Sequence, residues 1–209
     1  KIVKIDSMQF GFMAGRSTTD AIFIVRQLQE KYLAKNKELW MAFVDLEKAF
    51  DRVPREVVWW ALRYLGVDEW IVSVIRAMYE DATTKVRLNG RESNAFSVRV
   101  GVHHGSVLSS LLFIIVLGAL SREFREDLPM ELLYADDLVL MAESEELLME
   151  KLRKRKNGME AKGLRVNAGK TKVMQCRVSR CQNEDSGEHP GGVCRKGVGK
   201  NSNLMCEVS

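Results

Sequence analysis

Proline and cysteine are both scarce, since the 209 residues include only 3 Pro and 4 Cys. The four cysteines, Cys176, Cys181, Cys194 and Cys206, all lie towards the C-terminal end, so disulfides cannot crosslink the main body. Their spacings do not pair ligands two to four residues apart, as zinc sites usually do, and we do not expect zinc. We expect reduced thiols and an intracellular protein, in the nucleus or the cytoplasm.

Long hydrophobic runs are also lacking. The longest largely apolar stretch, residues 107–120, is too short to span a bilayer and favours a buried helix. No basic segment followed by an apolar one opens the sequence, so neither secretion nor a membrane partner is expected. With 46% hydrophobic and 29% charged residues, the composition is that of a globular chain and excludes wholesale disorder.

Charge is unevenly distributed. Residues 1–150 hold 18 Lys and Arg against 23 Asp and Glu, whereas residues 151–180 hold 11 Lys and Arg and the single acid Glu160. A dense cationic segment attracts phosphate backbones by releasing their counterions. A solvated helix face gives the same pattern, so the segment indicates nucleic-acid binding only if phosphate chemistry is found elsewhere.

Hydrophobic periodicity predicts helices interleaved with strands. Helices are expected over 17–35, 54–65, 68–79, 107–120 and from Ser144 to just before Gly163; strands are expected over 39–44, 131–135 and 138–141, with a short pair at 164–166 and 172–176. Alternation at 84–88 and 96–100, with Asn89-Gly90 between them, predicts a β-hairpin. This order favours an α+β fold over a doubly wound sheet.

Acidic residues stand at the ends of predicted strands. Asp45 follows the strand 39–44, and Asp136-Asp137 separates two apolar strands. Simple turn chemistry would explain an Asp in a tight turn. Adjacent carboxylates repel each other, however, and on a rigid hairpin they offer the hard oxygen ligands that Mg²⁺ prefers. Three acids on neighbouring strands could hold two metal ions for in-line phosphoryl transfer.

Five segments, in a fixed order, carry a resemblance to a known family. They are Gln9-Phe10-Gly11-Phe12 with Gly15-Arg16-Ser17-Thr18, residues 43–51 (FVDLEKAFD), residues 101–112, Tyr134-Ala135-Asp136-Asp137, and residues 163–172 (GLRVNAGKTK). They resemble the fingers-to-palm segment and the palm motifs, including the YADD box, of reverse transcriptases from non-LTR (LINE-type, jockey-like) retrotransposons. The resemblance spans residues 9–174 of the chain.

The resemblance implies a right-hand polymerase palm, which is a ferredoxin-like antiparallel sheet with packed helices, together with partial fingers and no complete thumb. It divides the chain into a fingers-to-palm segment (1–35), the palm (36–178) and a tail (179–209) that we expect to be disordered. The implied activity is RNA-directed DNA polymerisation. Its partners would be an RNA template, a DNA primer and deoxynucleoside triphosphates.

Roles follow residue by residue from the same resemblance. Asp45, Asp136 and Asp137 would hold two Mg²⁺ ions, with Mn²⁺ as an alternative, and Lys170 would protonate the leaving pyrophosphate, with Lys172 as a competing candidate. Further implied substrate or nucleic-acid contacts are Phe50 as the steric gate, His104 and Gly105 in the base-pair pocket, Arg16 on phosphate or template, and Lys151, Arg153, Lys154, Arg155 and Lys156 along the nucleic acid. Phe50 as plain core and Arg16 as a surface residue remain the alternatives.

Some positions depart from the family pattern. His104, Ser106 and Ser110 stand where the family commonly has Gln, Cys and Pro, and serine leaves the backbone less rigid than proline does. We therefore expect reduced efficiency and fidelity. Because the resemblance leaves the upstream fingers and the thumb without counterparts, we expect a palm-centred fragment of a longer polyprotein, or a decayed copy, with weak or no processive activity. The alternatives are a catalytically inactive nucleic-acid-binding remnant and a nucleotide cyclase, although the chain lacks the Gly-Gly-Asp/Glu hairpin that a cyclase would carry.

Overall fold

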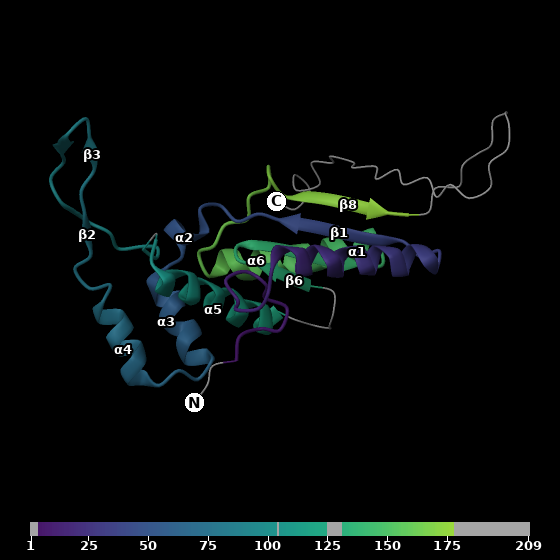
Figure 1. Ribbon diagram of the computed structural model, residues 1–209, viewed down its shortest axis with the longest axis horizontal. Coiled ribbons are helices and arrows are strands. Elements are labelled where there is room, and N and C mark those ends of the chain that lie inside the picture. The colour runs from purple at the N-terminus through teal and green to yellow at the C-terminus, as the bar shows by residue number, and fades with distance from the viewer. Residues whose placement is uncertain (1–3, 104, 125–130, 178–209) are drawn as a thin grey trace.

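The computed structural model describes residues 4–103, 105–124 and 131–177 (Figure 1). The predicted tail and His104 lie outside these described residues. The helices are α1 (Thr18–Ala34), α2 (Ala49–Arg52), α3 (Arg55–Tyr64), α4 (Glu69–Ala77), α5 (Val107–Phe124) and α6 (Glu145–Ala161). The strands of the main sheet are β1 (Leu39–Val44), β6 (Glu131–Tyr134), β7 (Asp137–Ala142) and β8 (Lys172–Cys176).

The main sheet has the order β6-β7-β1-β8 and is antiparallel throughout. Its central strand β1 pairs Val44 with Leu138 of β7 and Leu39 with Cys176 of β8. Taken in chain order, the four strands and their connecting helices form the ferredoxin-like arrangement, in which strands one and three are central neighbours. This confirms the α+β prediction. The expected strand at 164–166 is reduced to a single bridge between Leu46 and Val166.

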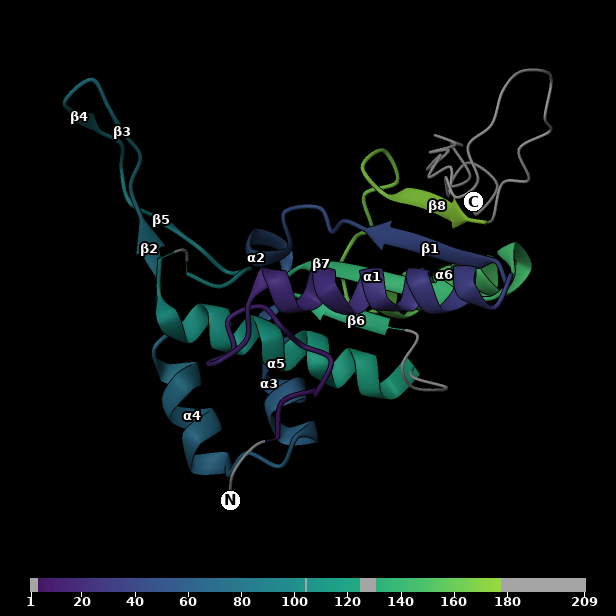
Figure 2. The ribbon, with the colours of Figure 1, turned by 45° about the vertical axis from the view of Figure 1, so that its right-hand side comes forward.

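Alternation along the strands sends side chains into two separate cores. In β1, Leu39 and Met41 lie in a cluster with α1, whereas Ala42 and Val44 lie in the cluster that includes residues of α3, α5 and α6. Because successive side chains of a strand point to opposite faces, one apolar strand can be buried on both. The result is a sheet with α1 on one face and α5 and α6 on the other (Figure 2).

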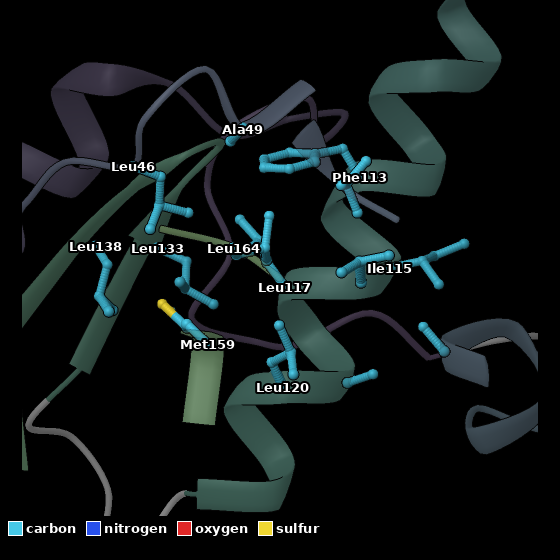
Figure 3. Packing of buried hydrophobic residues seen from close by; sticks show 14 of the residues in the cluster. Leu46, Ala49, Phe113, Ile115, Leu117, Leu120, Leu133, Leu138, Met159 and Leu164 are labelled. Carbon is cyan, nitrogen blue, oxygen red and sulfur yellow. The ribbon is translucent and has the colours of Figure 1, made fainter. Parts of the chain in front are cut away.

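The larger core joins one face of the sheet to the helices behind it. Figure 3 shows Leu117 and Leu120 of α5 on the side of the helix that faces Leu133 of the sheet, and Phe113 turned towards Ala49. The other residues labelled there are Leu46, Ile115, Leu138, Met159 and Leu164. Since α5 is apolar almost all round, it packs in the interior as the sequence predicted. Among the described residues, no helix is both long and apolar enough to cross a bilayer.

Helix α1 begins as its sequence predicts. The Ser17 hydroxyl accepts a hydrogen bond from the Asp20 amide (3.3 Å), and the Asp20 carboxylate accepts one from the Ser17 amide (2.7 Å). This capping box satisfies two donors that the first helical turn leaves without partners. The capping box thus fixes where the helix that covers the sheet starts.

A two-stranded arm, residues 83–97, projects away from the rest of the molecule (Figures 1 and 2). Its short ladders are β2 (Thr83–Thr84) with β5 (Phe96–Ser97) and β3 (Arg87–Leu88) with β4 (Arg91–Glu92). Asn89 and Gly90 both have positive φ, 48° and 77°, as a type I′ turn requires. The predicted hairpin is therefore confirmed. The two ladders are separated at Val86, because its amide donates to the Ser93 hydroxyl rather than to a backbone carbonyl of the other strand.

Candidate active site

The predicted acids meet at one end of the main sheet. Asp45 follows Val44, whose partner across the ladder is Leu138, and Asp137 directly precedes Leu138. In antiparallel register this makes Asp45 and Asp137 cross-strand neighbours. Tyr134 pairs with Asp137, so Ala135 and Asp136 form the turn between β6 and β7. Residues far apart in the sequence are thus brought to one hairpin tip.

The electrostatics of this tip favour a cation. Asp45 Oδ2 is buried and accepts no hydrogen bond from any described residue. Although Asp137 is exposed as a whole residue, desolvation by the surrounding protein raises the pKa of its carboxyl, and the charges of Asp136 and Asp45 raise it further. A carboxylate oxygen that is buried without a partner is costly, and a bound cation would remove that cost.

The donor set fits a divalent ion that is completed by substrate. Within the described part of the chain, no group of three or more His, Cys, Asp or Glu side chains could hold a metal ion by itself. Mg²⁺ is commonly held by one or two carboxylates, with water and substrate phosphates filling its remaining positions. The juxtaposed acids and the unpartnered oxygen of Asp45 are compatible with that chemistry.

The turn that carries Asp136 is held from behind by Gln9. Ala135 has φ 55°, a left-handed conformation that is uncommon for a residue with a side chain. The Gln9 side chain is fully buried, and its Oε1 accepts hydrogen bonds from the amides of Ala135 (3.1 Å) and Gly11 (2.9 Å). A Cβ on Gly11 would lie 2.2 Å from the Ala135 nitrogen, so only glycine allows this close approach.

The rest of the N-terminal segment reinforces this contact. The Phe10 amide donates to the Leu133 carbonyl (2.8 Å), which extends the sheet beyond its edge strand β6. Arg16 donates from Nη1 to the Ser7 and Gln9 carbonyls, the latter at 2.9 Å, and lies over the Phe10 ring. Arg16 therefore braces the segment that supports the turn, and its predicted contact with phosphate or template stays a prediction.

The turn at residues 167–171 lies directly beside Asp45. The Asn167 amide donates to the Asp45 carbonyl (2.8 Å), and the Asp45 amide donates to the Thr171 hydroxyl (3.4 Å). Lys170 is exposed in this turn, next to the acidic cluster. Lys172 is the first residue of β8, and its ammonium donates to the Gly169 carbonyl (3.4 Å). Both lysines are exposed, and the choice between them as the general acid stays a prediction.

The predicted substrate pocket lies next to the same end of the sheet. Phe50, in α2, stacks on Phe113 with ring centroids 4.4 Å apart and makes an edge contact with Phe12 at 6.4 Å. Its ring is partly buried against the larger core, and its predicted role as the steric gate stays a prediction. Gly105 has φ 80° and is exposed just before α5. The predicted role of His104 cannot be placed, because this residue lies outside the described ones.

The basic residues of α6 divide into two groups, and one prediction is wrong. Arg153 and Lys154 are exposed, and Lys151 and Lys156 are partly so. Arg155 is buried and pairs with Glu131, and its guanidinium also donates to the Leu120 and Ser121 carbonyls at 3.4 Å. Helical periodicity turns this one cation towards α5. Arg155 therefore binds carbonyls near the C-terminal end of α5 and is not placed to contact a phosphate backbone.

Sequence reasoning gave no role to Gln9, Asn167 or Thr171, although all three hold the acidic cluster in place. All three lie inside segments that carried the family resemblance, and this was the only available signal. Periodicity does not identify a buried amide, since polar residues are expected to be exposed. The exposed hydrogen bond from the Thr18 hydroxyl to the Tyr134 hydroxyl (2.6 Å) was also missed, because it joins segments that are far apart in the sequence.

A ferredoxin-like sheet with paired carboxylates at a hairpin tip defines the class of palm-type polymerases. Solved structures agree on the fold: the telomerase of Candida tropicalis, truncated from the C-terminal domain, matches with a TM-score of 0.64 and 18% identity over 80% of this chain and 36% of that one. Candida albicans telomerase in complex with a fragment of telomeric RNA matches with a TM-score of 0.62 and 17% identity over 84% and 32%.

Sequence comparisons give the family. Residues 1–190 match the family described as reverse transcriptase (RNA-dependent DNA polymerase), and the chain belongs to this family. Its relatives include a Pol polyprotein of the type-1 retrotransposable element R2 of Popillia japonica, 28% identical over 86% of this chain and 26% of that protein. The polymerase of the mobile element jockey of Drosophila melanogaster is 25% identical over 69% and 16%. The chain thus spans about a quarter or less of these relatives.

Proposed function

We propose that this chain is the palm portion of an RNA-directed DNA polymerase of a non-LTR retrotransposon. It would add deoxynucleotides to a primer 3′-hydroxyl on an RNA template. The observation that carries the proposal is the buried, unpartnered oxygen of Asp45 beside the Asp136–Asp137 turn. Membership of the reverse transcriptase family supports the same conclusion.

In this proposal, Asp45, Asp136 and Asp137 hold two Mg²⁺ ions, with Mn²⁺ as an alternative. The bound ions supply charge neutralisation for the triphosphate and for the developing charge of in-line phosphoryl transfer. The protein holds the carboxylates rigidly, because Asn167 and Thr171 fix the backbone of Asp45 and Gln9 fixes the turn before Asp137. Positioning of this kind removes much of the entropic barrier of a two-substrate reaction.

Lys170 and Phe50 complete the proposed reaction. Lys170 donates a proton to the departing pyrophosphate, since it is exposed in the turn that is bonded to Asp45. Phe50 excludes the 2′-hydroxyl of a ribonucleotide by occupying its space, and its stacking on Phe113 limits how far its ring can move. The inactive-remnant alternative is not favoured, because all three acids are present and adjoin at one hairpin tip.

Primer extension on an RNA template tests this function. Wild-type protein with Mg²⁺ should lengthen a labelled DNA primer, and Asp136→Asn should lower the rate by at least about 100-fold, as expected for loss of a ligand that acts in the transition state. Asp68→Asn is the matched control, because Asp68 is exposed at the start of α4 and Asn caps a helix equally well.

A second readout does not depend on turnover. Mn²⁺ binding, followed by the loss of its free-ion paramagnetic resonance signal, should weaken in Asp45→Asn and Asp136→Asn and remain unchanged in Asp68→Asn. Equal extension and equal Mn²⁺ binding in Asp136→Asn and wild type would reject the proposed function. Mn²⁺ binding without extension would instead assign the chain to the inactive-remnant alternative.

A further inference from the structure

The arm at residues 83–97 packs against no other part of the described chain. Every one of these residues is exposed, including Val86, Leu88 and Phe96. An isolated two-stranded hairpin is at best marginally stable in water. A protruding ribbon that is exposed on both faces is therefore suited to binding a partner.

The charge of the arm indicates which partner. The arm contains Lys85, Arg87 and Arg91 but only one acid, Glu92, whereas residues 1–150 as a whole hold more acidic than basic residues. The Lys85 ammonium and the Arg87 guanidinium both reach the Glu92 carboxylate (3.4 and 2.6 Å), so these side chains share one face. Arg91 pairs across the ladder with Leu88 and lies on the opposite face.

Cations on both faces of a narrow ribbon suit a nucleic-acid groove. Both walls of a groove are phosphate chains, and the wide, shallow minor groove of an A-like helix leaves its 2′-hydroxyls and phosphates open to side chains. The strand from Thr83 to the turn at Asn89 extends for about 20 Å at the usual rise per residue, enough to follow a groove for a good part of a helical turn. A protein partner would instead favour an arm whose exposed faces were both largely apolar.

The base of the arm is fixed beside the candidate active site. The strand that leaves the arm ends at Gly101 and Val102, whose amides donate to the carbonyls of Val53 (3.0 Å) and Phe50 (2.9 Å). A Cβ on Gly101 would lie 2.6 Å from the Asp51 carbonyl oxygen. The absence of a side chain at Gly101 therefore allows the two segments to lie this close together. In both views the arm rises at the end of the molecule towards which β1 points, where Asp45 lies (Figures 1 and 2).

We propose that the arm at residues 83–97 binds the phosphate backbone of an RNA–DNA hybrid next to the active site. Lys85, Arg87 and Arg91 make the contacts, and the type I′ turn at Asn89-Gly90 holds the two strands in register. The arm adds a second anchorage for nucleic acid, separate from the basic face of α6. This inference rests on the proposed function only in taking the hybrid as the ligand.

The test is a salt titration of hybrid binding. Fluorescence anisotropy with a 20-base-pair RNA–DNA hybrid, without nucleotide or divalent ion, compares wild type with a variant carrying Lys85→Gln, Arg87→Gln and Arg91→Gln. On duplex DNA the slope of log K against log salt changes by about 0.9 for each phosphate contact. We expect the slope to become shallower by roughly 1 to 3 units, together with weaker binding at low salt.

The matched control removes the same charge elsewhere. Arg26→Gln, Lys31→Gln and Lys35→Gln remove three exposed cations from α1 and its C-terminal end, on the other side of the sheet from α5 and α6, and should leave the slope within experimental error. Loss of Arg87 breaks its ion pair with Glu92. Arg91→Gln alone therefore serves as a variant that breaks no ion pair among the described residues, with an expected slope change of about 1.

Hydrogen exchange gives an independent readout. Amides within 83–97 should exchange more slowly in wild type when the hybrid is added, and the triple variant should lose this protection. An arm variant with the same slope as the α1 control, or an arm with no added protection, would overturn the proposal. Normal hybrid binding without primer extension would count against the proposed polymerase function and leave the arm intact.

Discussion

At the scale of single residues, the fold keeps three carboxylates close together although their charges repel one another. The pKa of Asp137 is raised by desolvation and by the charges of Asp136 and Asp45, so the folded protein pays for keeping this carboxyl ionised. A group whose pKa is higher in the folded state destabilises the protein above that pKa, and the penalty disappears below the pKa of the unfolded chain. The cluster therefore opposes folding at neutral pH.

Asp137→Asn should accordingly raise the melting temperature at neutral pH. The gain should stay below about 1 kcal/mol because the group is largely exposed, which corresponds to about 3 °C or less. The difference from wild type should shrink as the pH falls through the raised pKa. Calorimetric melting curves from pH 7 to pH 4 would measure this; a difference that stays constant with pH would contradict it, and Asp68→Asn serves as the control.

Gln9 should matter for stability as much as any apolar core residue nearby. Gln9→Leu leaves the amides of Ala135 and Gly11 buried without an acceptor, at a cost of about 1–3 kcal/mol for each unpaired group. Urea unfolding would measure the loss. Gln27→Leu, which removes only a weak bond to Glu30 on α1, should change the unfolding free energy by less than about 0.5 kcal/mol.

Phe50 tests the proposed sugar selection. Phe50→Ala opens the space between Phe12 and Phe113, and ribonucleotide incorporation should rise relative to deoxynucleotide incorporation by at least about 10-fold. Single-nucleotide extension with matched ribo- and deoxynucleotides measures the ratio of kcat/KM values. An unchanged ratio, with both rates reduced equally, would mean that Phe50 belongs only to the core.

At the scale of elements, α6 shows how far a charge pattern can be interpreted from sequence. A run of cations predicts attraction to phosphate, and Arg153 and Lys154 are exposed as that prediction requires. The same run contains Arg155, which faces α5 and Glu131 instead. The helical period could have shown that one residue in the run points inward. The acidic partner, however, lies in another element and could not be predicted.

Arg155→Met should therefore destabilise the protein strongly. Removing one member of a buried ion pair leaves an uncompensated charge, which costs about 3–5 kcal/mol. Adding Glu131→Leu should restore most of the loss, because the pair is replaced by apolar groups of similar size. Denaturant unfolding would give both values. The salt dependence of nucleic-acid binding should be unchanged in Arg155→Met but reduced in Arg153→Gln.

The elements themselves were largely predictable, and their assembly was not. Ser17, Gly66, Asn89-Gly90 and Ser144 mark boundaries through local chemistry, and each boundary lies where the sequence placed it. The short helix α2 was missed because four residues carry no measurable period. The packing of residues 8–10 against β6 depends on backbone bonds between distant segments, for which a single sequence gives no signal.

At the scale of the whole molecule, the N-terminal segment closes one edge of the sheet. Residues 8–10 bond to Leu133, and Phe10 is buried among residues of α1 and the sheet. Deleting residues 1–11 would uncover the edge of β6 together with apolar surface. Exposed strand edges promote association between chains. We expect oligomers or precipitation by light scattering, whereas deletion of residues 1–3 alone should leave the size distribution unchanged.

The position of β1 in the sheet has a consequence for synthesis. This apolar strand is translated before both of its partners, which begin only at residues 137 and 172. Until both have been translated, the nascent chain carries a hydrophobic strand with neither edge paired, a state that favours misassembly. Expression at low temperature, or together with chaperones that shield this strand, should therefore improve the yield of folded protein.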